Sequence, residues 1–183
     1  VTVAEADAMA DTNQELLGLA SYLLSYPNAQ WLEAFPEAKA QVATLEPEAT
    51  RTVLGDVISY IEGELPKEYE DEYVRVFDFS QNTNLYLASY DCSASGEQAE
   101  KLLKFKELYE RNGFDVASEL PDYVPALLEL CATVDVAEAH RIGRTIKPYL
   151  ELLRQRLIDS QQVHAFILDV VLNEIERWER EAQ

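Results

Sequence analysis

Several residue types are scarce in this chain of 183 residues, and each scarcity excludes a class of protein. The two cysteines, Cys92 and Cys131, are too few for a disulfide framework and do not form a Cys-x-x-Cys pair that could bind zinc. The two histidines, His140 and His164, lack the Glu-x-x-His spacing of a di-iron bundle, and we expect both at the surface or its boundary. The sequence therefore predicts a reduced, intracellular protein with no metal site and no cofactor.

Signals for export, membrane insertion and common catalysis are also missing. Residues 1–11 carry three acids and no base, unlike the start of a secretory signal, and we expect them to be a flexible segment. The longest apolar run, residues 163–172, contains a histidine and an aspartate and is too short to span a bilayer. Neither a Gly-x-x-x-x-Gly-Lys nor a Gly-x-Ser-x-Gly motif is present. We therefore predict a cytoplasmic protein that is not an enzyme.

Negative charge is abundant and unevenly distributed. The formal net charge is −19, from 34 acidic and 15 basic residues. From His140 onward seven bases match seven acids, which leaves 27 acids, 8 bases and the whole net charge in residues 1–139. Such a field repels nucleic acid and attracts a basic peptide. An acidic surface also keeps proteins soluble, so charge alone leaves both interpretations open.

Apolar residues recur every three or four positions along most of the chain, which predicts an all-α fold of about eight or nine helices in one domain. We expect a helix to break at Pro36, another to be kinked or divided at Pro148, and Gly113 to end a third. Asp135, with Glu138, should cap the helix that follows it. Residues 85–90 alternate weakly, but no partner strand is evident, so we expect them to be helical or irregular.

The last helix should begin at Ser160 as its cap. Its predicted core-facing stripe starts at Val163 and Phe166 and ends at Trp178.

The stretch from Leu120 to Leu130 combines a helix start with an apolar stripe. Pro121 disfavours helical geometry before it, and Asp122 can cap the turn that follows. Tyr123 and Leu127 fall on one helical face, beside the carboxylates of Asp122 and Glu129. The arrangement suits holding a peptide, although an ordinary core helix has the same pattern.

An acidic stretch lies upstream of this helix. Residues 62–78 hold seven acids, and their apolar stripe includes Tyr73 and Phe77, followed by Asp78. A solvated helix face is the common explanation of such a run.

These segments, in this order and spacing, carry a resemblance to a known family. The pattern Tyr73-x-x-x-Phe77-Asp78, then residues 85–90, then Leu120-Pro121-Asp122 with its apolar helix, resembles the NarJ family, the nitrate reductase delta subunits. Members are molybdenum cofactor assembly chaperones within the all-helical redox-enzyme maturation chaperones. The resemblance covers residues 65–131. It departs at Gln98-Ala99, where family members tend to carry Arg-Gly, and this leaves the identity of the client enzyme open.

The resemblance implies a single chaperone domain over residues 1–183, monomeric or dimeric. It would bind the N-terminal tail of the apo catalytic subunit of a molybdoenzyme, assist molybdenum cofactor insertion and then leave. Aromatic and aliphatic walls would seat the tail and carboxylates would meet its basic residues, although we expect core packing to explain at least half of the apolar members. The predicted peptide-binding residues are Tyr73, Phe77, Asp78, Leu120, Asp122, Tyr123, Leu127 and Glu129.

Two alternatives stay open. One is the same role for another molybdoenzyme, such as a selenate, dimethylsulfide or ethylbenzene-type oxidoreductase, which Gln98-Ala99 slightly favours. The other is an unrelated acidic helical regulator that sequesters a basic protein.

Overall fold

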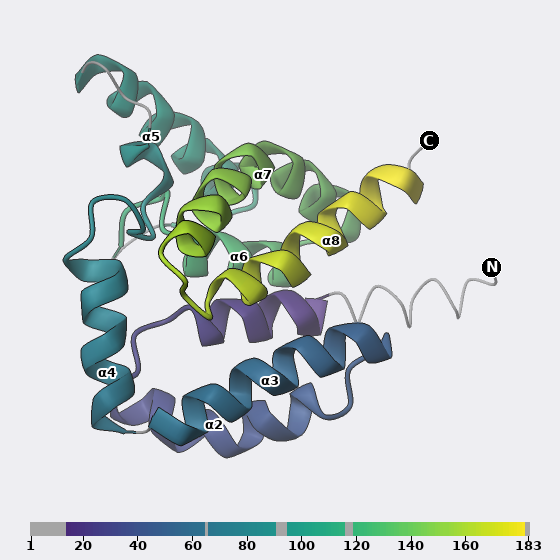
Figure 1. Cartoon of the computed structure of the whole chain (residues 1–183). Helices are drawn as coiled ribbons and strands as arrows, with labels where there is room; N and C mark the ends of the chain where they lie inside the picture. The colour runs from purple at the N-terminus through teal and green to yellow at the C-terminus, as the bar shows by residue number, and fades with distance from the viewer. Residues whose placement is uncertain (1–13, 65, 91–94, 116–118, 182–183) are drawn as a thin grey trace.

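A computed structural model describes residues 14–64, 66–90, 95–115 and 119–181 (Figure 1). Within these ranges the fold is all-α, as predicted, and the only extended pairing is a single antiparallel bridge between Tyr86 and Tyr123. None of the helices in the described parts of the chain is both long and apolar enough to cross a bilayer. The segment expected to be flexible, residues 1–11, and Cys92 lie outside the described residues.

Eight α-helices and two shorter helical segments follow one another along the described chain. Residues 14–23 form the first helix. The others are α2 (Ala29–Val42), α3 (Glu48–Glu64), α4 (Lys67–Tyr73), the π-helical η1 (Val74–Asp78), the 3-10 segment η2 (Leu87–Ser89), α5 (Ser95–Arg111), α6 (Val124–Thr133), α7 (Val136–Asp159) and α8 (Ala165–Glu181).

The helices surround one continuous core. The first helix lies between the α2–α3 pair and α8, and the paired helices α7 and α8 pack on α6 and α3 (Figure 1). Helix α5 extends away from this body at one end (Figure 1). Both halves of the chain contribute fully buried side chains. They include Leu17, Leu23, Leu54, Leu127, Leu153 and Val171. Burial of this apolar surface holds the helices together.

Two predicted helix ends are confirmed. The Asp135 carboxylate accepts the Glu138 backbone N–H at 3.0 Å and caps α7. Helix α5 ends before Gly113, whose φ of +75° is a left-handed conformation that glycine adopts without a Cβ clash. The next N–H, that of Phe114, donates to the Tyr109 carbonyl at 3.0 Å and closes the helix.

The prediction of a helix break at Pro36 was wrong, and Pro148 does not divide its helix. Helices α2 and α7 continue through Pro36 and Pro148 without being divided. Buried side chains lie on both sides of each proline, including Phe35 and Ala38 in α2. We attribute the continuity to packing on both sides, which offsets the loss of one backbone hydrogen bond.

The predicted start of the last helix was also wrong. Ser160 terminates α7, and α8 begins at Ala165. Gln161, with φ of 55°, turns the chain between them. Phe166, expected in the core, is 52% exposed, because the helix starts on a face that its neighbours do not cover.

Candidate functional site

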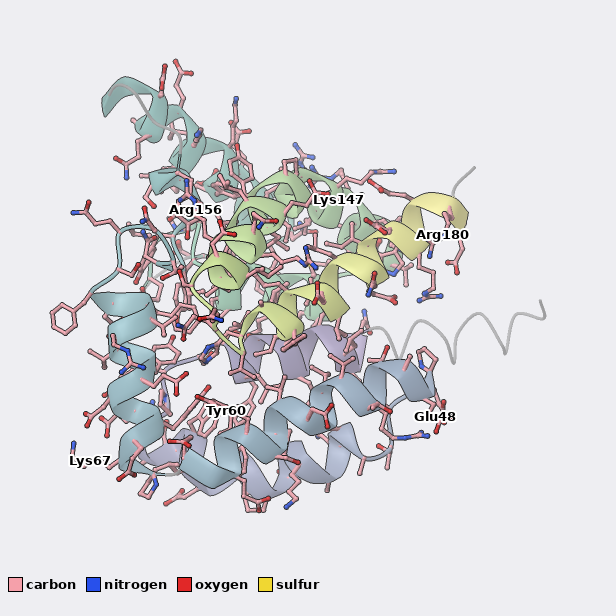
Figure 2. All side chains as sticks on the ribbon, viewed as in Figure 1. Glu48, Tyr60, Lys67, Lys147, Arg156 and Arg180 are labelled. Atoms are coloured by element: carbon pink, nitrogen blue, oxygen red, sulfur yellow. The ribbon has the colours of Figure 1, made fainter. Side chains whose placement is uncertain are left out.

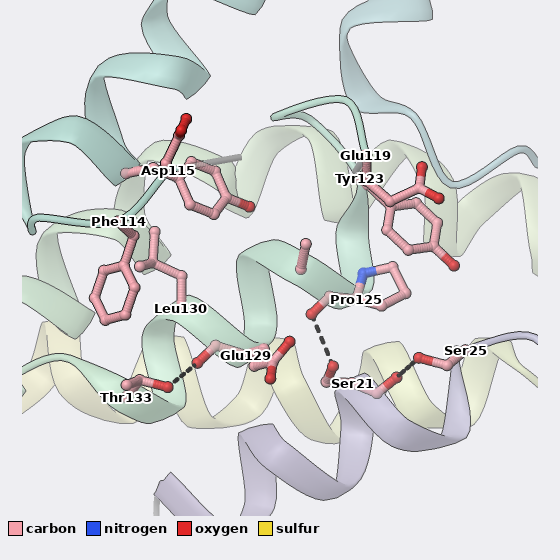
Figure 3. Close-up of a pocket in the computed structure, with 12 residues that line it drawn as sticks. Ser21, Ser25, Phe114, Asp115, Glu119, Tyr123, Pro125, Glu129, Leu130 and Thr133 are labelled. Atoms are coloured by element: carbon pink, nitrogen blue, oxygen red, sulfur yellow. Dashed lines mark hydrogen bonds between the residues drawn. The ribbon is translucent and has the colours of Figure 1, made fainter. Parts of the chain in front are cut away.

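A groove of about 480 Å³ opens between α6, the first helix and the segment that follows α5 (Figure 3). The residues that line it combine apolar walls with carboxylates and hydroxyls. They are Ser21, Ser25, Tyr109, Phe114, Asp115, Glu119, Tyr123, Pro125, Ala126, Glu129, Leu130 and Thr133.

The start of α6 is held in place by the segment around η2. The Val124 N–H donates to the Leu85 carbonyl at 2.9 Å, and the Leu87 N–H donates to the Asp122 carbonyl at 3.1 Å. The Asp122 carboxylate accepts the Ala88 N–H at 2.8 Å. Two motifs that are 34 residues apart in the sequence are thereby fixed to each other.

Asp122 is therefore a structural link, and the prediction that it caps α6 was wrong. The cap position belongs to Tyr123, and no side chain caps the helix there. Asp122 is only 1% exposed and does not line the groove. Burial raises the pKa of this carboxyl, while the hydrogen bond from Ala88 opposes the rise. Its second oxygen, Oδ1, has no hydrogen-bond partner among the described residues.

Three other predicted site residues lie in the core. Tyr73, Phe77 and Leu127 are 2%, 3% and 0% exposed. The Tyr73 hydroxyl donates to the Leu24 carbonyl at 2.9 Å, and its ring lies 4.8 Å from that of Phe77, centroid to centroid. These contacts serve packing, as expected for at least half of the apolar members.

The remaining predicted residues reach the surface. Tyr123 is half-buried and Glu129 is exposed, and both line the groove. Asp78 and Leu120 are exposed but do not line it. The structure thus brings two of the eight predicted side chains together in this groove.

The groove is acidic, and sequence reasoning missed most of what makes it so. Asp115 and Glu119 lie on the segment between α5 and α6 and join Glu129 along the groove (Figure 3). Glu119 accepts the Tyr86 hydroxyl at 3.1 Å. Of the described residues that line the groove, none is basic. The one available signal was position, because both acids fall between the helix-ending Gly113 and the Leu-Pro-Asp motif.

The floor of the groove also presents hydrogen-bond acceptors. The Ser21 hydroxyl donates to the Pro125 carbonyl and the Ser25 hydroxyl to the Ser21 carbonyl, both at 2.8 Å (Figure 3). These hydroxyl protons are committed, so the serine oxygens can only accept from a ligand. The site is therefore suited to a ligand rich in N–H donors and positive charge.

Within the described parts of the chain, neither histidine nor Cys131 belongs to a cluster of metal-binding side chains. No group of three or more His, Cys, Asp or Glu side chains within the described residues could hold a metal ion. His140 is half-buried and stacks on Trp178, as expected of a boundary residue. His164 is fully buried, so the expectation of a surface or boundary position was wrong. Its Nε2 lies 3.1 Å from the Tyr69 hydroxyl, and burial lowers its pKa to about 4.

Comparisons with known proteins agree on one family. The profile of the nitrate reductase delta subunit family matches residues 43–166. The chain is 30% identical over 157 residues to the probable nitrate reductase molybdenum cofactor assembly chaperone NarJ of Bacillus subtilis. The matched region covers 85% of each protein. The chain is 28% identical over 159 residues to the NarJ chaperone of Escherichia coli K12, covering 85% of this chain and 67% of that one. The nitrate reductase-like protein NarX of Mycobacterium tuberculosis H37Rv is 32% identical over 126 residues, 67% of this chain and 18% of that protein.

Proposed function

Since the chain belongs to the nitrate reductase delta subunit family, we propose that it is a molybdenum cofactor assembly chaperone for a nitrate reductase. It binds the N-terminal tail of the apo catalytic subunit, keeps that subunit unassembled during cofactor insertion, and leaves before the enzyme is complete. It carries out no catalysis itself. The observation that supports tail binding is the acidic groove beside α6, which offers carboxylates and apolar walls together.

The groove suits an amphipathic, basic tail. Phe114, which is 41% exposed, together with Tyr123 and Leu130, would contact the apolar face of a bound helix. The carboxylates of Glu119 and Glu129 would pair with lysine or arginine side chains on its other face. The excess of acid in residues 1–139 would add a long-range attraction.

Titration calorimetry with a synthetic tail peptide tests this proposal. A peptide of about 15 to 20 residues forms a helix of roughly 22 to 30 Å. Its affinity should fall as salt shortens the screening length from about 30 Å at 0.01 M to about 3 Å at 1 M. The residual affinity at high salt reports the apolar contacts.

Neutralising single carboxylates shows which of them contribute to the affinity for the peptide. Glu129→Gln should weaken binding about twofold to fivefold at low salt and flatten the salt dependence. Glu33→Gln is the matched control, because Glu33 is an exposed acid on α2 that does not line the groove. If the affinity did not depend on salt, or if a charge-reversed peptide bound equally well, the acidic groove would serve solubility and not tail binding.

The identity of the client rests on a separate observation. Gln98 and Ala99, at the start of α5, replace the Arg-Gly that the family tends to carry, and this slightly favours the alternative client, a selenate, dimethylsulfide or ethylbenzene-type oxidoreductase. Purification from the native host with mass spectrometry of bound proteins distinguishes the two. Recovery of a nitrate reductase catalytic subunit supports the first proposal, and recovery of another molybdoenzyme supports the second. Family membership weighs against an unrelated acidic regulator.

A further inference from the structure

A second hollow, of about 530 Å³, lies where α7 turns into α8 above α3. It shares no lining residue with the acidic groove. Tyr60, labelled in Figure 2, lies on α3 below this turn in the view shown. The residues that line the hollow are Tyr60, Arg154, Ile158, Gln161, Gln162, Val163, Ala165, Phe166 and Asp169.

Large apolar side chains gather at this hollow and remain in contact with solvent. Phe166 is 52% exposed, Ile158 40% and Tyr60 39%. Scattered exposed apolar residues are ordinary, but several around one depression mark an interaction surface.

The polar groups around the hollow are paired with one another. Arg154 donates to Asp169, and the Tyr60 hydroxyl donates to the Glu72 carboxylate at 2.7 Å. The Gln162 side chain donates to the Ser160 carbonyl at 2.7 Å. The two charged lining residues, Arg154 and Asp169, neutralise each other, so a molecule that covers the hollow meets mainly apolar surface and needs no counter-charge.

The distribution of charge selects the partner. All lining residues except Tyr60 belong to residues 140–183, where seven bases match seven acids. Any contact between two copies through residues 1–139 opposes surfaces that share the net charge of −19. Repulsion between two copies is therefore weakest where they meet through the α7–α8 face, although the net charge of each whole chain still opposes their approach.

We propose that this face binds a second copy of the chain, with Phe166 of each copy entering the hollow of the other. A two-fold interface needs a projection and a matching recess on the same surface, and Phe166 beside the hollow provides both. The three exposed apolar side chains make a small contact, so the dimer is reversible and depends on concentration. The acidic groove of each copy shares no lining residue with the hollow, so both grooves stay open in the dimer.

Sedimentation velocity over a range of concentrations tests self-association of the full chain. The wild-type protein should show a monomer–dimer equilibrium, and Phe166→Glu should raise its dissociation constant at least about tenfold. Ile158→Glu provides a second variant at a residue that is already 40% exposed. Phe79→Glu is the control, because Phe79 is 83% exposed and does not line the hollow. Circular dichroism verifies that each variant is folded.

Salt gives an independent readout. Raising ionic strength from about 0.05 M to about 0.5 M should strengthen the dimer, because the apolar contact is retained and repulsion between acidic surfaces is screened. A short thiol cross-linker should trap Phe166→Cys as a covalent dimer, whereas Phe79→Cys should dimerise without being cross-linked.

Three results would overturn the proposal. The first is a wild-type chain that stays monomeric up to about 1 mM, a limit at which association is negligible in cells. The second is equal loss of dimer in Phe166→Glu and Phe79→Glu. The third is a monomeric chain in which Phe166→Glu instead abolishes capture of the apo catalytic subunit, which would assign the face to the client.

Discussion

Asp122 joins the start of α6 to the segment around η2 through one buried hydrogen bond. Removing its carboxylate deletes the hydrogen bond that the Ala88 N–H donates to Asp122. We expect Asp122→Ala to lower the free energy of unfolding by about 1 to 3 kcal/mol, as measured by chemical denaturation. Asp122→Asn keeps an acceptor oxygen and should cost less. Equal losses in the two variants would show that this hydrogen bond contributes nothing.

Comparing Asp122→Asn with the wild type at several pH values separates the effect of the carboxylate's charge from that of its hydrogen bond. Burial raises the pKa of Asp122 above its usual value of 3.8, so the folded state disfavours the ionised carboxylate. The resulting penalty is fully present above the raised pKa and disappears as pH falls toward 3.8. The unfolding free energy of Asp122→Asn relative to wild type should therefore be highest at about pH 7 and decline on acidification. A pH-independent difference would contradict a raised pKa.

His164 acts in the opposite direction. Its pKa is lowered from 6.5 to about 4 by burial, so the folded state binds a proton less readily than the unfolded chain. Stability contributed by the neutral ring is present above pH 6.5 and is lost as pH falls toward 4, by about 3 kcal/mol in all. His164→Gln should show a shallower loss over this range in denaturant titrations. If the two proteins lost stability in parallel as pH falls, the pKa of His164 would be the same in the folded and unfolded states.

At the scale of elements, the close contact between α7 and α8 depends on a glycine, Gly143, which has no side chain. A Cβ on Gly143 would lie 2.8 Å from the Trp178 ring, closer than packed atoms approach. We expect Gly143→Ala to destabilise the fold by about 1 to 3 kcal/mol, although alanine favours helices by about 1 kcal/mol.

Gly55 in α3 is the matched control, since nothing lies within 4 Å of its added Cβ. Gly55→Ala should raise the thermal midpoint through helix propensity alone. Stabilisation by both substitutions would show that α7 and α8 move apart at little cost.

At the scale of the whole molecule, the two proposed contacts are separated by their electrostatics. Tail binding draws on the acidic field of residues 1–139 and weakens with salt, whereas self-association uses the α7–α8 face and strengthens as salt screens the repulsion between the two acidic chains. The all-α architecture itself predicts a far-UV circular dichroism spectrum dominated by helix. A strand content of about one quarter, the average for globular proteins, would contradict it.

The sequence by itself determined the local features of this protein. The 3.6-residue apolar period predicted the all-α class, and Asp135 and Gly113 marked helix ends that the structure confirms. The spacing of the Tyr73, Phe77 and Asp78 pattern from the Leu-Pro-Asp motif identified the family, which the profile match bears out. These signals are readable because capping, left-handed turns and helix periodicity act between residues a few positions apart.

Only the tertiary structure decided which side chains meet. Periodicity tells which face of a helix is apolar, but it does not tell which element covers that face. Asp122 is therefore buried against η2, His164 lies in the core, and Phe166 remains exposed. Asp115, which follows α5, and Glu119, which precedes α6, line the same groove as Glu129. Such positions depend on packing between helices far apart in the sequence, where burial of apolar surface outweighs local preference.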